Sequence, residues 1–141
     1  MGVDEEGMTE QHAWIGPVGP IRVSDKPTPQ RIAAATGAAR AQKLITVDEH
    51  LDALLAEPDE WVRYEVVARL EARGRDDART VPALVEALAN DPSAAVRDAA
   101  AMALWEHVED ERVTDALSHA LADADADVRW SAAYGLARRS G

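Results

Sequence analysis

Alternating acidic residues in the C-terminal part of the chain are its nearest approach to a metal site. Asp123, Asp125 and Asp127 are spaced like the first ligands of a calcium-binding loop. Such a loop also needs Gly at its sixth position and Glu at its twelfth, where this chain has Val128 and Tyr134. We therefore interpret the segment as a turn whose carboxylates favour the start of the next helix.

The other residue types that carry chemistry are scattered or missing. Cysteine is absent, which excludes disulfides, thiolate metal sites and a cysteine nucleophile. No Gly-x-Ser-x-Gly motif and no phosphate-binding loop occurs. The histidines fall on different segments at no metal-ligand spacing, and they are His12, His50, His107 and His119. The sequence therefore predicts that the protein is not an enzyme and has no catalytic residue, no metal site and no cofactor.

Aromatic side chains and one methionine form a pattern that favours binding. The chain has four Trp, two Tyr and no Phe, and Trp, Tyr and Met are enriched at protein interfaces. Most of them fall on three similar segments, on the side of a helix that periodicity predicts to be exposed. The candidate partner-binding residues are Trp61, Tyr64, Met102, Trp105, Trp130 and Tyr134. Two interpretations stay open: an exposed binding patch, or rings that only pack against neighbouring helices.

Those three segments repeat one pattern. The Val-Arg pair at residues 62–63 recurs at 96–97 and at 128–129, and a Leu follows each Arg by seven residues. A polar turn precedes each pair, and before the turn lies a stretch with apolar residues at helical spacing. Each unit is therefore predicted to be two helices, A and then B. A single helix pair cannot bury its apolar face, so the units are expected to stack.

Capping residues predict where these helices begin. Asp59, Ser93 and Asp125 stand three residues before the Val of each pair, where a side chain can cap helix B. Thr46 and Glu49 have the spacing of a capping box at the first helix A. The predicted elements are a leading helix at 29–44 and units at about 46–73, 80–107 and 112–139.

The segment from about Thr46 to Leu136 resembles the HEAT-like repeats first seen in bilin lyases. The shared pattern is an Asp-Pro-Asp-like turn, Val-Arg, a small pair and then Leu. It appears as DPSAAVRDAAAMAL at 91–104 and DADADVRWSAAYGL at 123–136, while the first unit has Val66 and Val67 in place of the small pair. The resemblance implies an all-α fold, a short α-solenoid of helical hairpins. It leaves the function open, because such repeats serve many roles.

One activity of HEAT-like relatives lacks its residues in this chain. The deoxyhypusine hydroxylases bind a di-iron centre through His-Glu pairs on their B helices. The matching positions here are Tyr64-Glu65, Asp98-Ala99 and Trp130-Ser131. Because the histidines are missing, the resemblance implies no di-iron chemistry.

The recurring arginines invite a second comparison, with DNA glycosylases of HEAT-like fold, which need a basic concave surface. Arg63, Arg97 and Arg129 stand at the structural position of the repeat itself. We therefore expect an internal ladder, in which each Arg pairs with an acidic turn residue of a neighbouring unit, such as Asp91 or Asp123.

The overall charge narrows the class of partner. With 26 acidic and 15 basic residues, the chain carries a net charge of −11, which disfavours binding to nucleic acid and to anionic membranes. The start of the chain lacks a signal peptide, and no run of about eighteen apolar residues is present. We therefore expect a cytoplasmic protein, and the excess of Ala and Arg is typical of a bacterial one.

Residues 1–28 are predicted to form a separate flexible or extended arm. They contain several Pro and Gly residues and no helical period. Within them, Trp14 and Ile15 are bulky apolar residues that gain little by lying in water. The arm is therefore expected either to dock on the repeats or a second chain, or to remain a simple tail. The repeat domain is predicted to span residues 29–141.

The sequence favours a non-catalytic adaptor or scaffold that binds a neutral or basic protein or peptide with its B-helix face. Two alternatives stay open. One is a small-molecule accessory protein or lyase-like enzyme that uses the same groove. The other is a structural subunit that associates with itself through the N-terminal arm or the open C-terminal end.

Overall fold

The structure, a computed structural model, describes residues 15–16, 19–20 and 28–140. The chain divides into two compact units at the boundary between Ile32 and Ala33. In the first, strand β1 (Ile15–Gly16) pairs antiparallel with strand β2 (Gly19–Pro20), and Ile15 lies opposite Pro20. The rest of the predicted arm, including Trp14, lies outside the described residues.

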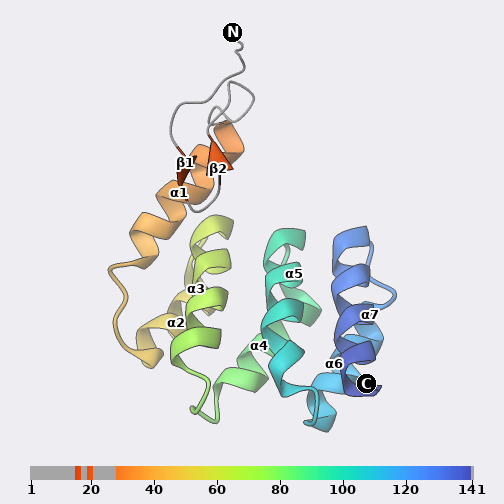
Figure 1. Cartoon of the computed structure of the whole chain (residues 1–141). Helices are drawn as coiled ribbons and strands as arrows, with labels where there is room; N and C mark the ends of the chain where they lie inside the picture. Colours follow the sequence, from red (N-terminus) through yellow and green to blue (C-terminus); the bar gives the residue numbers. More distant parts are fainter. Residues whose placement is uncertain (1–14, 17–18, 21–27, 141) are drawn as a thin grey trace, which may run out of the picture. The chain divides into compact units, whose positions relative to one another are not determined.

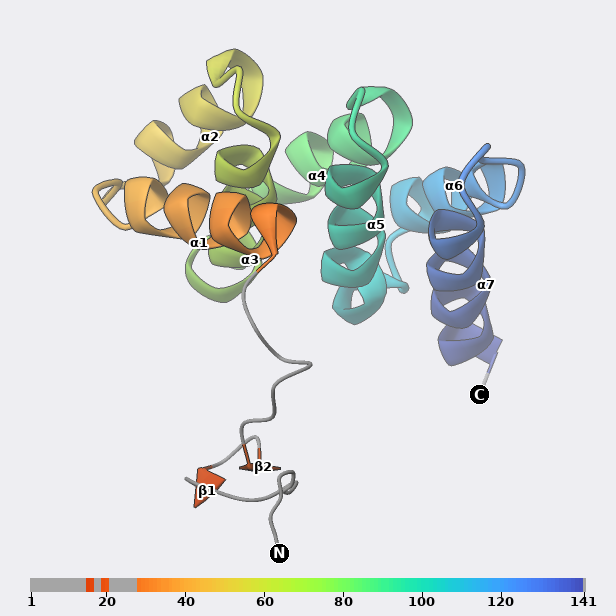
Figure 2. The same ribbon diagram turned by 90° about the horizontal axis from the view of Figure 1, so that it is seen from above.

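The second unit consists of stacked helices, which confirms the predicted short α-solenoid (Figure 1). Helix α1 (Pro29–Ala41) leads into it and ends three residues before the predicted boundary. Three hairpins follow, and they are α2 (Val47–Ala56) with α3 (Glu60–Arg73), α4 (Thr80–Asn90) with α5 (Ala94–Ala103), and α6 (Glu111–Ala120) with α7 (Ala126–Ser140). The B helices α3, α5 and α7 pack side by side in one row, and α2, α4 and α6 lie behind them (Figures 1 and 2).

The predicted caps are present at the helix starts. The Thr46 hydroxyl accepts a hydrogen bond from the Glu49 amide, and the Glu49 carboxylate accepts one from the Thr46 amide, so the capping box is complete. The Asp59 carboxylate accepts from the Trp61 amide, and Ser93 caps α5. Asp125 accepts from the amides of residues 127 and 128 at the start of α7. These side chains satisfy amide groups that a helix leaves unpaired at its first turn.

The core lies between the two rows of helices. The B helices contribute the aligned Val positions, with Val62, Val96 and Val128 buried, and the A helices contribute Leu84 and Leu117. Helix α5 has a neighbouring B helix on each side, and its residues Ala99, Ala100, Ala101 and Ala103 are all buried. Small side chains let packed helices approach closely, which explains why an Ala-rich core without Phe suits this stack.

The second B helix differs from the predicted continuous helix. After Ala103 the chain tightens into a 3-10 turn, η2 (Leu104–His107). This turn keeps both Leu104 and Val108 buried while it redirects the chain toward α6. Trp105 therefore lies in this turn and not in helix α5.

Candidate functional site

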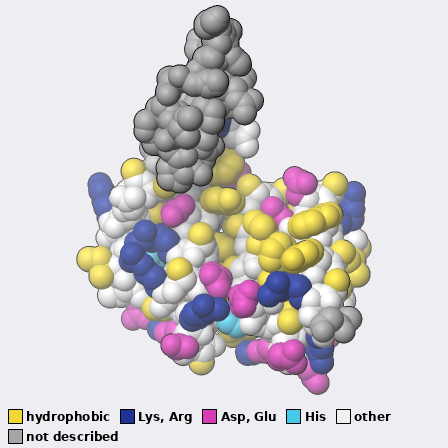
Figure 3. Space-filling model, in the orientation of Figure 1, with side chains coloured by type: hydrophobic (Ala, Val, Ile, Leu, Met, Phe, Trp, Pro, Cys, Tyr) yellow, Lys and Arg dark blue, Asp and Glu magenta, His cyan; other side chains and the backbone are white. Residues whose placement is uncertain are grey.

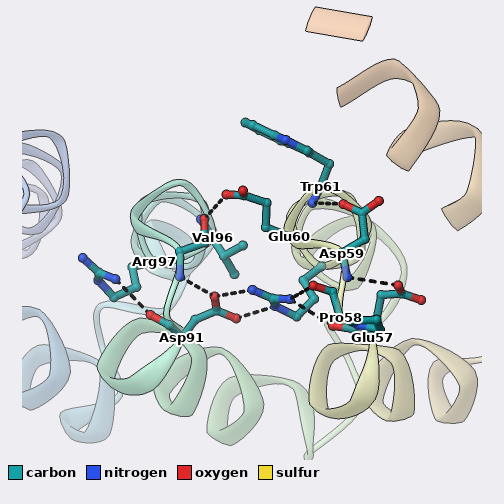
Figure 4. A network of polar contacts seen from close by, with 10 residues as sticks. Glu57, Pro58, Asp59, Glu60, Trp61, Asp91, Val96 and Arg97 are labelled. Carbon is teal, nitrogen blue, oxygen red and sulfur yellow. Dashed lines mark hydrogen bonds and ion pairs between the residues drawn. The ribbon is translucent and has the colours of Figure 1, made fainter. Parts of the chain in front are cut away.

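An internal ladder of arginines joins the repeats, as the sequence predicts. Arg63 of α3 donates through Nε and Nη2 to the two carboxylate oxygens of Asp91, at 2.9 and 3.0 Å (Figure 4). Arg97 of α5 does the same to Asp123, again at 2.9 and 3.0 Å. The hydrogen bond from Arg97 holds the pKa of Asp123 below its ordinary value. These arginines therefore fasten one repeat to the next and are not available as a basic surface.

The two ends of the ladder differ from its middle. At the N-terminal end, Arg40 of α1 pairs with Glu57 at 3.1 Å and with Asp59 at 3.2 Å, so α1 occupies the place of a preceding repeat. At the C-terminal end, Arg129 donates to the backbone oxygens of Asp123 and Ala124. Among the described residues no carboxylate forms an ion pair with Arg129. Within the described part of the chain, the last rung therefore presents a guanidinium group that no carboxylate bonds directly.

Three of the candidate aromatic residues form one cluster where η2 meets α7. The ring centroids of Trp105 and Tyr134 are 4.5 Å apart, and Trp130 stacks on Tyr134 at 5.3 Å with an interplanar angle of 13°. Hydrophobic side chains gather over α5 and α7 on this face of the molecule, with acidic side chains above them (Figure 3). Aromatic pairs in such offset arrangements attract one another beyond the area that they bury.

The members of this cluster have different surroundings. The Trp105 indole donates to the Ser131 carbonyl at 2.9 Å, and a side chain at Gly135 would come within 2.8 Å of its ring. Trp105 is thus a packing residue between two helices. By contrast, Trp130 is 62% exposed and Tyr134 is 42% exposed. We call Trp130 and Tyr134 the aromatic pair.

The remaining candidates lie elsewhere on the B helices. Trp61 contacts Tyr64 edge to face at 5.7 Å, and the backbone of Trp61 lies against Gly37 of α1. Tyr64 and Met102 line a groove of about 490 Å³ between α3 and α5. The structure therefore divides the predicted patch into a groove between the first two repeats and the aromatic pair on the third.

The electrostatics of the aromatic pair are acidic. Asp98 of α5 accepts a hydrogen bond at 2.5 Å from the hydroxyl of Ser131, the neighbour of Trp130. Burial raises the pKa of Asp98 above its ordinary value, and the carboxylates of Asp127 and Asp125 raise it further. The sequence alone identifies Asp98 and Ser131 only as positions where the histidine ligands of the di-iron relatives are missing. No local sequence signal predicts that these two side chains are in contact.

A larger groove on the A-helix row was not predicted. It has a volume of about 580 Å³ and lies between α2 and α4. Leu55, whose helical spacing groups it with buried residues, is 83% exposed beside it, and Leu121 is 44% exposed at the matching place of the third repeat. The Leu54-Leu55 doublet does not reveal this exposure, because two adjacent helix residues can both be buried, as Val66 and Val67 are.

The histidines of the repeats do not assemble into a metal site. His50 is buried, and its ring accepts a hydrogen bond from Arg69 at Nε2 while Nδ1 lies 2.7 Å from the Thr46 carbonyl oxygen. These contacts hold α2 to α3. Within the described part of the chain, no group of three or more His, Asp and Glu side chains could hold a metal ion.

Comparison with protein families assigns the repeats. Residues 22–105 and 47–137 both match the family model for HEAT repeats. These matches cover most of the chain, which belongs to the HEAT repeat family. Members of this family are commonly scaffolds for protein interactions and mostly not enzymes. The bilin-lyase type of repeat stays a prediction.

Two further findings bear on relatives and on membranes. No curated protein matches the sequence. None of the helices in the described residues is both long enough and apolar enough to cross a membrane.

Proposed function

We propose that this protein is a non-catalytic binding module that holds a neutral or basic protein or peptide on its B-helix face. The observation that supports this best is the exposure of Trp130, which is 62% exposed while stacked on Tyr134. Burying an apolar ring beneath a partner gains about 25 cal/mol for each Å² removed from water. A rigid aromatic pair fixed from below by Trp105 also loses little conformational freedom on binding.

The groove between α3 and α5 extends the same face toward the first repeat. Met102 of α5 is 37% exposed in its lining, one turn before the Trp105 that supports the aromatic pair. Glu106, another lining residue, bonds Arg138 of α7 at 3.0 Å. A peptide bound across the three B helices would thus contact both the groove and the aromatic pair.

Selection from a library of displayed random peptides tests this function. Peptides that bind the full chain are expected to lose about tenfold or more in affinity for Trp130→Ala, because truncating a hot-spot Trp costs about 2 kcal/mol. Leu55→Ala is the matched control, since Leu55 is even more exposed than Trp130 but lies on the A-helix row. Equal affinity for Trp130→Ala, or an equal loss for Leu55→Ala, would contradict the proposal.

Self-association through the open C-terminal end is a second candidate. It is favoured by Arg129, which has only backbone oxygens as hydrogen-bond acceptors among the described residues, and by the exposed Leu121. A second copy that supplied a carboxylate would complete the last rung. Light scattering of the native chain and of Arg129→Glu tests this candidate. Self-association requires that the native chain has a mass larger than a monomer and that the variant has the mass of a monomer.

A further inference from the structure

Carboxylates from two helices lie near the start of α7, the helix that carries the aromatic pair. Asp127 precedes Trp130 by three residues on α7, and residues at this spacing lie on the same side of a helix. Asp98 reaches α7 from α5, where it accepts the hydrogen bond from Ser131. Both carboxylates therefore lie near the N-terminal end of α7, which is the end closer to Trp130.

The arginines next to this surface are engaged elsewhere. Arg129 donates to the backbone oxygens of its own turn, and Arg138 bonds Glu106. In the described residues, neither Asp98 nor Asp127 forms an ion pair with Lys or Arg. Burial and two neighbouring carboxylates disfavour the charged form of Asp98, which raises its pKa.

We propose that the aromatic pair, with the carboxylates of Asp98 and Asp127, seats a lysine or arginine side chain of the bound protein. This inference rests on the binding function proposed above and names the residue that the partner must supply. The face of a Trp or Tyr ring attracts a cation, the apolar stem of Lys or Arg packs on an exposed ring, and the carboxylates supply the opposite charge. An acidic or purely apolar anchor would leave those carboxylates unpaired in the interface.

Charge removal on both sides of the contact tests this proposal. On the peptide, each Lys or Arg of a selected sequence is replaced in turn by norleucine, which keeps the apolar stem and removes the charge. On the protein, the variant is Asp98→Asn with Asp127→Asn. Its matched control is Asp52→Asn with Asp115→Asn, two exposed carboxylates on α2 and α6. Both double variants remove two charges and take the net charge from −11 to −9.

Calorimetric titration gives the dissociation constants of these pairs. For the native chain, replacing the anchor residue of the peptide by norleucine is expected to weaken binding about tenfold or more. For the variant Asp98→Asn with Asp127→Asn, the same replacement is expected to weaken binding by less than about threefold. The control variant is expected to behave like the native chain. Circular dichroism checks that each variant is folded.

Two results would overturn the inference in distinguishable ways. Peptides that depend on Trp130 but lose the same affinity to norleucine in every variant would refute the cationic anchor and leave the binding function standing. A selection that yields no peptide dependent on Trp130 would refute the binding function and the anchor with it.

Discussion

Arg97 and Asp123 form a two-pronged ion pair across the boundary between the second and third repeats. Nε and Nη2 of Arg97 lie 2.9 and 3.0 Å from the two carboxylate oxygens, and both side chains are mostly buried. A third hydrogen bond runs from Nη1 of Arg97 to the backbone oxygen of Asp91 at 2.9 Å. One guanidinium group thus connects its own turn to the turn of the following repeat.

Removal of this connection is expected to destabilise the fold. We predict that Arg97→Ala lowers the free energy of unfolding by about 1–3 kcal/mol, because the carboxylate of Asp123 loses a charged hydrogen-bond donor. Arg129→Ala is the matched control at the same repeat position. Arg129 meets only backbone oxygens among the described residues, so its loss is expected to cost at most about 1 kcal/mol. Denaturant unfolding measures both, and equal losses would contradict the ladder.

The same ion pair predicts how stability responds to acid. The pKa of Asp123 is lower in the folded chain, where Arg97 bonds its charged form, than in the unfolded chain, where it is about 3.9. The pair therefore contributes its full stability above that value and loses it as the pH falls through the folded pKa. The difference in unfolding free energy between the native chain and Arg97→Ala should shrink steadily below about pH 4. A difference that stays constant down to the acid transition would show that the pair does not titrate.

Repeat spacing is why the sequence predicts so much of this fold. The Val-Arg column at 62–63, 96–97 and 128–129 places each Arg at one structural position. The acidic partners of Arg63 and Arg97 in the next turn follow from this spacing, whereas Arg129 has no such partner among the described residues. The caps Asp59 and Ser93 are equally local, because an N-cap bonds an amide only two or three residues away.

The exposure of the rings could not be predicted in the same way. The sequence places both Trp105 and Trp130 on predicted B helices, but Trp105 packs between η2 and α7 while Trp130 is exposed. The difference arises from the 3-10 turn after Ala103 and from Gly135, whose missing side chain leaves room for the Trp105 ring. Helical periodicity gives no information about either feature, because the turn departs from the helical period and the contact with Gly135 joins residues far apart in sequence.

These different surroundings predict different costs of truncation. Trp130→Ala removes an exposed ring, and we expect it to change the free energy of unfolding by less than about 1 kcal/mol. Trp105→Ala removes a packed, half-buried ring and a hydrogen bond to Ser131, so its cost should clearly exceed that of Trp130→Ala while staying below the about 3–5 kcal/mol typical of a fully buried Trp. Thermal unfolding of the two single variants distinguishes them. Similar losses would mean that Trp130 is also a packing residue.

Replacement of Asp98 is expected to stabilise the protein. Because burial and neighbouring carboxylates raise its pKa, ionised Asp98 disfavours the folded state above that pKa, and protonation relieves the cost as the pH falls. Asp98→Asn should therefore melt at a higher temperature than the native chain at pH 7, and the gain should vanish in acid. This pH dependence has the opposite sign to that of Asp123. A lower melting temperature for Asp98→Asn at pH 7 would show that the carboxylate is needed by the hydroxyl of Ser131.

Gly37 provides a test of how α1 is held on the repeats. Ala is favoured over Gly in a helix by about 1 kcal/mol, so propensity alone predicts that Gly37→Ala stabilises α1. Gly37 is buried, however, and a Cβ there would lie 2.7 Å from the backbone carbon and 2.9 Å from the backbone oxygen of Trp61. A backbone contact of this kind cannot be relieved by a rotamer change, so α1 must move away from α3.

We therefore expect Gly37→Ala to lower the melting temperature despite its better helix propensity. The movement should also separate Arg40 from Glu57 and Asp59, which makes the amides of α1 exchange faster with solvent. Ala39→Gly, at an exposed position of the same helix, is the control that changes propensity without a steric contact. If Gly37→Ala instead raised the melting temperature and slowed exchange in α1, the close approach of α1 to Trp61 would be refuted.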